Sequence, residues 1–167
     1  RYIWDQIMTD KVIIKSLDTI LLRESKDCLF TYSTIKETSE LNDQNIASAP
    51  LTVQEYVTQK TDIRVTVIGD KLVAVIITSE GHGIEEDWRT VDRDLVEYTE
   101  IELPKDIKNH CFELLRKLKL NFGAIDLLLS NGEFIFVEIN PTGEWGWLVN
   151  SERRFDVDIA SWLIEGK

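Results

Sequence analysis

Two carboxylates and an amide stand inside two otherwise apolar segments in the last third of the chain. The segment 123–129 contains Asp126, and the segment 134–140 contains Glu138 and Asn140. If both segments are strands, side chains alternate between two faces, so Glu138 and Asn140 share a face. Packing the apolar faces of the two strands together then places Asp126 beside Glu138. Oxygen donors without His or Cys are typical of a Mg²⁺ or Mn²⁺ site.

This arrangement sets a condition on the connection between the two strands. A two-residue Asn-Gly turn would pair Asp126 with Val137, and the carboxylates of Asp126 and Glu138 would point to opposite faces. We therefore predict a three- or five-residue loop, or a bulge in one strand. Two carboxylates on a half-buried face also favour a bound cation, because like charges repel and burial disfavours ionisation.

A simpler interpretation is that Asp126 and Glu138 are solvated side chains on the exposed face of an ordinary hairpin. Apolar residues that the strict alternation assigns to the same face favour a covered face instead. These residues are Ala124, Leu128, Phe134 and Phe136.

The elements that must position these groups are short strands and two helices. Apolar runs rich in β-branched and aromatic residues predict strands over 11–15, 28–33, 51–57, 62–68 and 71–78, in addition to the two acidic segments. From Pro104 apolar residues recur at helical spacing as far as Leu118, and they do so again over 156–165. We expect one α+β domain of antiparallel sheets with flanking helices.

Composition narrows the classes of partner. The chain has 167 residues, of which 43% are apolar, and a net charge of −11. Such a charge repels nucleic acids and anionic lipid surfaces, so we expect neither as a partner. The apolar runs are far shorter than the about 20 residues that cross a bilayer. Cys28 and Cys111 have no companions at metal-ligand spacing, which disfavours a disulfide framework or a zinc site and favours the cytoplasm.

Six blocks in collinear order give the chain a resemblance to the ATP-grasp ligases. The blocks are residues 12–15, 54–57, 62–69, 87–89, 123–126 and 137–141. Block 87–89 and the sequence 140–148 resemble most closely the microviridin or graspetide ligases, which crosslink ribosomal peptides. The ribosomal-protein glutamate ligases are the next most similar. The resemblance implies the ATP-grasp fold.

The resemblance also implies roles in binding nucleotide. Lys15 would reach the α- and β-phosphates of ATP, since a lysine ammonium suits phosphate as a mobile point charge. Gln54 and the backbone of Glu55, Tyr56 and Val57 would form the hinge that reads adenine. Taken singly, Lys15 also fits a surface charge and residues 54–56 fit an edge strand, so the joint order of the blocks carries these assignments.

The remaining roles concern ribose, phosphate and metal. By the same resemblance, Asp62 would approach the ribose hydroxyls. Arg64 and Arg89 would be the catalytic residues that stabilise charge on the γ-phosphate and on an acyl-phosphate intermediate. The metal ligands would be Asp126, Glu138 and Asn140. An ordinary ion pair between Asp62 and Arg64 is the alternative for those two residues.

The implied activity is that of an ATP- and Mg²⁺-dependent carboxylate ligase. A side-chain carboxylate of a peptide would become an acyl phosphate and then be captured by a hydroxyl or an amine, giving an ester or amide crosslink. The alternatives are a glutamate-ligase or glutathione-synthase-like carboxylate-amine ligase acting on a small carboxylate, and a non-catalytic module that binds nucleotide or peptide. A structural scaffold is the interpretation if the hairpin binds no metal. A homodimer is compatible with each.

The chain departs from the family pattern in two respects. Residues 16–24 contain no glycine, whereas many members carry a glycine-rich phosphate loop at that point. An N-terminal α/β domain with a second phosphate-contacting lysine is also not recognisable upstream. We therefore expect residues 1–167 to be an ATP-grasp domain that forms the C-terminal portion of a longer ligase.

Overall fold

The chain divides into two compact units. The computed structural model describes residues 9–17, 21–24, 27–42 and 50–165. The first unit comprises Arg1–Thr58 and Glu85–Asp94, and the second comprises Gln59–Ile84 and Leu95–Lys167. The segment Glu85–Asp94 therefore belongs to the first unit although it lies between two stretches of the second.

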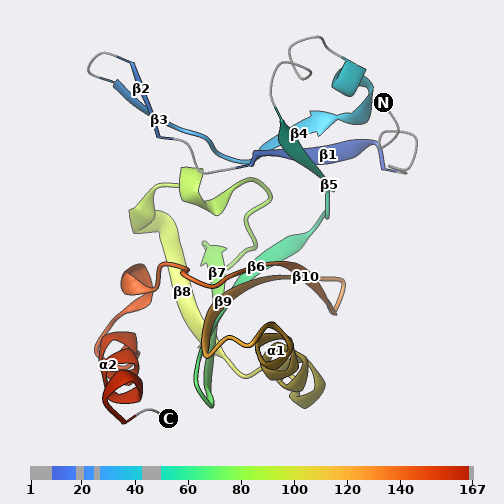
Figure 1. Ribbon diagram of the computed structural model, residues 1–167. Helices are drawn as coiled ribbons and strands as arrows, with labels where there is room; N and C mark the ends of the chain where they lie inside the picture. Colours follow the sequence, from blue (N-terminus) through green and yellow to red (C-terminus); the bar gives the residue numbers. More distant parts are fainter. Residues whose placement is uncertain (1–8, 18–20, 25–26, 43–49, 166–167) are drawn as a thin grey trace. The chain divides into compact units, whose positions relative to one another are not determined.

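The first unit is built on a three-stranded antiparallel sheet in the order β4-β1-β5 (Figure 1). Its strands are β1 (Lys11–Ser16), β4 (Thr34–Glu37) and β5 (Leu51–Glu55). A separate hairpin pairs β2 (Leu21–Glu24) with β3 (Asp27–Phe30). The β-branched run in β1 suits its central position, and Val12 is fully buried.

The second unit is built on a five-stranded antiparallel sheet in the order β10-β9-β6-β7-β8. Its strands are β6 (Lys60–Ile68), β7 (Lys71–Ser79), β8 (Val96–Ile101), β9 (Phe122–Ser130) and β10 (Glu133–Asn140). The turn Gly69-Asp70 joins β6 to β7, and Gly69 has a φ of 59°. A glycine adopts this left-handed conformation without steric cost.

Helix α1 (Lys105–Leu118) packs on one face of the five-stranded sheet. It begins after Pro104 and ends at Lys119, whose backbone is left-handed. Cys111 and Leu115 bury their side chains in a cluster with residues of β6 and β9, among them Val65 and Ile125. The amphipathic pattern from Pro104 to Leu118 is thus confirmed.

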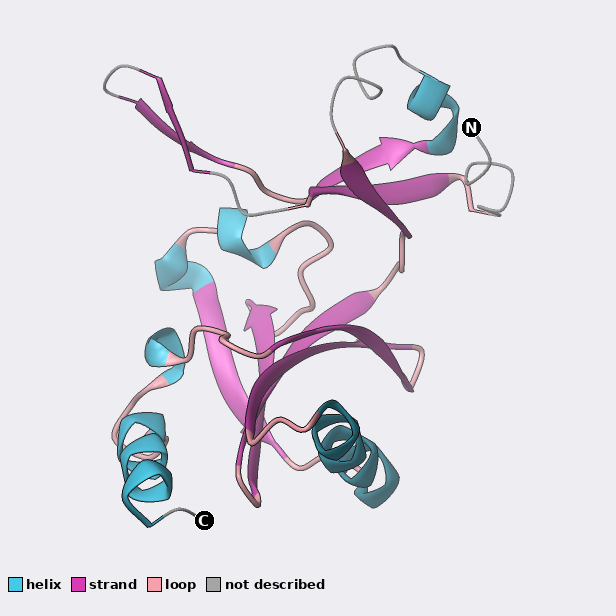
Figure 2. Cartoon of the chain, in the orientation of Figure 1, coloured by secondary structure: helices cyan, strands magenta, loops and turns pink. Residues whose placement is uncertain are grey.

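Helix α2 (Phe155–Glu165) packs on the opposite face of the same sheet (Figure 2). Its Phe155 is buried with Leu148 and with Val75, a residue of β7 whose neighbours Ala74 and Ile76 face α1. The carboxylate face of the β9-β10 hairpin is therefore the face that α2 and the segment before it share.

The α+β class of antiparallel sheets with flanking helices is confirmed. The predicted strand 28–33 is a strand only over residues 28–30, within β3, because residues 31–33 connect β3 to β4 outside any strand; β8 was not predicted. β8 lies at the edge of its sheet, and Glu97, Thr99 and Glu100 are exposed, so its apolar pattern is weak. No helix among the described residues combines the length and apolar character needed to cross a membrane.

Candidate functional site

A β-bulge places Glu138 opposite Asp126. The turn between β9 and β10 has two residues, Asn131 and Gly132, both with positive φ. The ladder runs regularly from the turn to the pair Leu127 and Phe136, and its register then shifts, so that Glu138 rather than Val137 pairs with Asp126. Of the predicted alternatives, the bulge is confirmed and the three- or five-residue loop is wrong, because the bulge supplies the change of register that the two-residue turn alone would not give.

The same bulge changes the faces of the residues near the turn. Because alternation resumes out of phase after an extra residue, Phe134 and Phe136 pair with Leu129 and Leu127 on the face that α1 covers. The prediction that these two phenylalanines cover the carboxylate face is therefore wrong. Glu138 is in fact exposed.

Arg64, Asp126 and Glu138 form a row across three neighbouring strands. Arg64 of β6 pairs with Asp126 of β9, which pairs in turn with Glu138 of β10. The Nε atom of Arg64 lies 2.9 Å from Oδ1 of Asp126, and the two side chains are 15% and 30% exposed. The sheet thus brings together one predicted catalytic residue and two predicted metal ligands.

Asn140 lies on the same face, two residues along β10 from Glu138. Its Oδ1 accepts hydrogen bonds from the backbone N–H of Thr142, at 3.0 Å, and from the Thr142 hydroxyl, at 3.3 Å. The Asn140 oxygen therefore stabilises the turn that follows β10 in this conformation. As a metal ligand it would exchange or share one of these contacts.

The oxygen atoms of Asp126, Glu138 and Asn140 fit a hard divalent cation that takes only part of its coordination shell from the protein. No cluster of three or more His, Cys, Asp or Glu side chains suited to a metal occurs within the described ranges. The predicted set of Asp126, Glu138 and Asn140 contains only two carboxylates, because its third member is an amide, so it does not count as a cluster of this kind. Mg²⁺ commonly takes one or two protein carboxylates and completes its shell with water and substrate phosphate.

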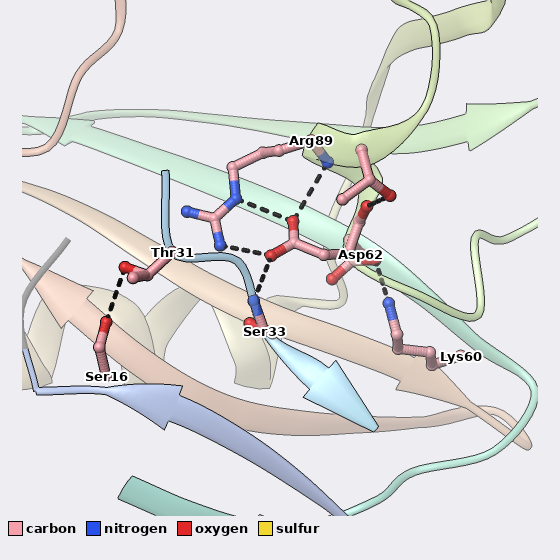
Figure 3. Close-up of polar contacts among 8 residues, drawn as sticks. Ser16, Thr31, Ser33, Lys60, Asp62 and Arg89 are labelled. Atoms are coloured by element: carbon pink, nitrogen blue, oxygen red, sulfur yellow. Dashed lines mark hydrogen bonds and ion pairs between the residues drawn. The ribbon is translucent and has the colours of Figure 1, made fainter. Parts of the chain in front are cut away.

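Asp62 pairs with a buried lysine that the sequence did not identify. Oδ2 of Asp62 lies 2.6 Å from Nζ of Lys60, and the Lys60 side chain is only 5% exposed (Figure 3). The alternative pairing of Asp62 with Arg64 does not occur, because Arg64 contacts Asp126. A lysine just before a predicted strand looks like a surface charge, and nothing in the sequence pattern indicated its burial.

The remaining predicted residues belong to the first unit. Lys15 is half-buried in β1, where it pairs with Thr52 of β5, and the neighbouring Ser16 hydroxyl lies 2.9 Å from that of Thr31 (Figure 3). In the glycine-free stretch 16–24, residues 18–20 lie outside the described part of the chain.

The proposed adenine hinge begins inside β5 and continues beyond its end. Gln54 and Glu55 are the last residues of β5, and Tyr56 and Val57 follow it. The Tyr56 hydroxyl donates a hydrogen bond to the Glu85 carboxylate. Burial and this neighbouring carboxylate raise the pKa of Tyr56 to about 12. Glu85 thereby ties the segment Glu85–Asp94 to the hinge within the first unit.

Arg89 is held by Asp87, two residues before it. Nε of Arg89 donates to Oδ1 of Asp87 at 2.8 Å and its Nη2 donates to Oδ2 at 2.6 Å, while the backbone N–H of Ser33 donates to Oδ2 at 3.0 Å (Figure 3). Burial alone would raise the pKa of Asp87, but the bonds from Arg89 and Ser33 outweigh it and lower the pKa to about 2. Asp87 was not predicted as a site residue, although the spacing Asp-X-Arg was visible.

The chain belongs to the RimK-like ATP-grasp domain family, whose model matches residues 8–166. The resemblance drawn from the collinear blocks is thus confirmed, and the fold is the ATP-grasp fold. Over 120 residues the chain is 30% identical to a probable alpha-L-glutamate ligase of Histophilus somni (strain 2336). This match covers 71% of this chain and 38% of that protein. A probable alpha-L-glutamate ligase of Picosynechococcus sp. is 29% identical over 119 residues.

Solved structures give the same fold. A RiPP-associated ATP-grasp ligase of Chryseobacterium gregarium, in complex with ADP and a leader and core peptide, is 27% identical with a TM-score of 0.83. The macrocyclase MdnC of Microcystis aeruginosa, bound with precursor peptide MdnA, is 23% identical with a TM-score of 0.79. In both cases the match covers 99% of this chain and 52% of the other. The chain therefore spans about half of these proteins and 38% of the glutamate ligase.

Proposed function

We propose that this chain serves an ATP- and Mg²⁺-dependent carboxylate ligase that acts on a peptide. The observation that carries the proposal is the row of Arg64, Asp126 and Glu138 across β6, β9 and β10. It sets two carboxylates beside one guanidinium on one sheet face, in a chain of the ATP-grasp family. Cation and guanidinium together suit a polyphosphate, because both act where negative charge accumulates.

The reaction in this proposal has two steps. An oxygen of the substrate carboxylate attacks the γ-phosphorus of ATP, the bond from γ-phosphorus to the bridging oxygen breaks, and ADP leaves. A hydroxyl or amine then attacks the acyl carbon of the resulting acyl phosphate, the bond from that carbon to the phosphate oxygen breaks, and inorganic phosphate leaves while the attacking group releases its proton to solvent. Bound Mg²⁺ would supply neutralisation of the phosphate charge. No protein nucleophile is needed, so the residues position and neutralise.

Each predicted residue has a part in this proposal. Asp126 and Glu138, with Asn140 beside them, hold the cation, and Arg64 stabilises charge that develops during phosphoryl transfer. In the second unit, Asp62 is the ribose contact, and its orientation depends on Lys60.

In this proposal, the residues of the first unit bind the nucleotide and the acyl phosphate. Lys15 contacts the α- and β-phosphates, and the backbone of residues 54–57 reads adenine. Arg89, oriented by Asp87, stabilises the acyl phosphate. These assignments follow the family resemblance, and the cytoplasm, where ATP is abundant, is the proposed compartment.

The peptide nature of the substrate is supported by one relative. The Chryseobacterium gregarium ligase, 27% identical to this chain, was solved with a leader and a core peptide. The second candidate is ligation of glutamate to a protein or peptide, and the probable alpha-L-glutamate ligase of Histophilus somni favours it at 30% identity. The two candidates share the acyl-phosphate step and differ in the acceptor.

Calorimetric titration with a non-hydrolysable ATP analogue, with and without Mg²⁺, tests the proposal. We expect Mg²⁺-dependent binding, weakened about tenfold or more by Glu138→Gln, because the substitution removes a charged ligand. Glu133→Gln is the matched control, since Glu133 is an exposed glutamate at the other end of β10. Binding that is absent, or equal with and without Mg²⁺, would overturn the proposal.

A further inference from the structure

The guanidinium of Arg64 stacks on an indole ring. Cζ of Arg64 lies 5.6 Å from the ring centroid of Trp147, which is within the range of a cation–π interaction. The Arg64 side chain is 15% exposed, so solvent weakens this attraction less than it would at a fully exposed site. Trp147 belongs to the turn Gly146–Leu148, which follows β10 in the second unit.

Two further contacts orient the Trp147 ring. Tyr98 of β8 meets it edge to face, with ring centroids 5.1 Å apart and an interplanar angle of 61°. The indole N–H donates a hydrogen bond to the backbone oxygen of Glu144 at 3.2 Å. The ring that Arg64 meets is therefore fixed from its edge and from its polar end.

The backbone at Gly143 closes a third side of Arg64. A Cβ atom added at Gly143 would lie 2.4 Å from Cβ of Ala124 and 3.3 Å from Nη1 of Arg64. The first of these distances is an outright clash, so the turn can approach β9 this closely only with glycine at this position. The segment after β10 thus packs directly on the guanidinium through Gly143 and Trp147.

The contact with Asp126 does not by itself orient Arg64. Nε of Arg64 lies 2.9 Å from Oδ1 of Asp126, yet this buried N–H makes no hydrogen bond with any residue in the described part of the chain. An ion pair without an aligned hydrogen bond attracts the guanidinium but leaves its plane less defined. A ring face opposes rotation of that plane.

We propose that Trp147 is a positioning residue that holds the Arg64 guanidinium beside Asp126. The inference rests on the proposed function, in which Arg64 neutralises phosphate charge and Asp126 binds the cation. Trp147 acts through Arg64 and touches neither the nucleotide nor the cation. Through Trp147, the segment after β10 contributes to the site by orienting Arg64, whereas Asn140 at the end of β10 contributes as a metal ligand.

Three variants separate this role from simple packing. Trp147→Leu keeps an apolar side chain and removes the ring, whereas Trp147→Phe keeps a ring face. Trp162→Leu is the matched control, because Trp162 of α2 packs against the same apolar cluster as Trp147. A purely structural role of Trp147 predicts that Trp147→Leu and Trp162→Leu behave alike in every measurement.

The first measurement is the side-chain N–H resonance of Arg64 in a ¹H–¹⁵N spectrum, assigned by its loss in Arg64→Lys. We expect the ring current of Trp147 to displace this resonance and burial to slow its exchange with water. Both effects should persist in Trp147→Phe and Trp162→Leu and disappear in Trp147→Leu. An unchanged resonance in Trp147→Leu would overturn the inference.

The second measurement is the Mg²⁺-dependent affinity for the ATP analogue in a double-mutant cycle. We expect Trp147→Leu to weaken binding about tenfold, Trp147→Phe to recover most of the loss, and Trp147→Leu to add nothing in an Arg64→Met background. Losses that multiply in the double variant would overturn the inference. If the wild type binds no nucleotide, the proposed function fails, and the Arg64 resonance alone decides whether Trp147 positions Arg64.

Discussion

Glu138 faces Asp126 because β10 contains one residue more than the stretch of β9 that it pairs with. Phe136 is opposite Leu127, and Glu138, two residues further on, is opposite the very next residue of β9. Without the bulge, the regular ladder would pair Val137 with Asp126, and the carboxylates would lie on opposite faces of the sheet. The bulge at a single residue thus allows the pair on which the proposed cation site depends.

Inserting one alanine between Val137 and Glu138 should abolish Mg²⁺-dependent nucleotide binding. With Val137 still bulged, the new alanine takes the place opposite Asp126, and Glu138 turns toward the apolar face under α1. Burial of an unpaired carboxylate also destabilises the fold by several kcal/mol. Calorimetry and urea unfolding measure the two effects. Deletion of Val137 is the control for a change of chain length, because Glu138 then pairs with Asp126 in a regular ladder, so an insertion variant that binds as the deletion variant does would contradict the prediction.

Asp62→Asn should cost much more stability than the same change at an exposed ion pair. Lys60 is 5% exposed, and the substitution removes the negative charge that lies 2.6 Å from its buried ammonium, at a cost of about 3 kcal/mol. The control is Asp158→Asn, because the partner of Asp158, Lys71, is 52% exposed, and such pairs contribute less than about 1 kcal/mol. Urea unfolding at pH 7 compares them, and equal losses would refute the argument.

Asp87 should make stability sensitive to acid. Its pKa is lowered from 3.8 to about 2 in the folded chain, so its contribution is complete above pH 4 and is lost as the pH falls toward 2. The shift corresponds to about 2 kcal/mol at neutral pH. We expect Asp87→Asn to be less stable than the wild type by that amount at pH 7, and by progressively less below pH 4.

Unfolding curves between pH 2.5 and pH 7 follow the difference between the two proteins. Asp92→Asn is the control for removal of an aspartate from the same segment, Glu85–Asp94. A difference between wild type and Asp87→Asn that does not change with pH would mean that the bonds from Arg89 and Ser33 do not favour the charged carboxylate.

Cys111 should resist alkylation in the folded protein. Cys111 is 4% exposed, and burial raises the pKa of its thiol to about 11, so little thiolate exists at pH 8. In a Cys28→Ser background, we expect iodoacetamide to modify Cys111 at least tenfold faster in urea than in buffer. Mass spectrometry of the time course measures both rates. Similar rates would show that α1 opens readily at this position.

The acidic hairpin was predictable because it depends on local rules. Alternation along a strand assigns Asp126 and Glu138 to faces, and the turn sequence then requires an irregularity if those faces are to match. The position of the irregularity is not encoded so locally. A bulge nearer the turn or further from it satisfies the same requirement, and the faces of Phe134 and Phe136 depend on that position.

Other features depend on contacts between residues distant in the chain. Asp87 binds the backbone of Ser33, and Trp147 meets Arg64, although neither pair is close in sequence. The burial of Lys60 likewise depends on its surroundings in the folded unit. The family resemblance identified Asp87 as part of a block, but only the folded chain reveals which group the carboxylate holds.

The segment Glu85–Asp94 has a consequence for synthesis of the chain on the ribosome. Most of the first unit, Arg1–Thr58, precedes β6 and β7 of the second unit, but the segment Glu85–Asp94 is translated after these two strands. When residue 58 leaves the exit tunnel, the first unit still lacks Asp87 and therefore the acceptor for the Ser33 N–H. We expect neither unit to mature before the other has been partly made, so that the nascent chain folds its two units in an interleaved order rather than one after the other.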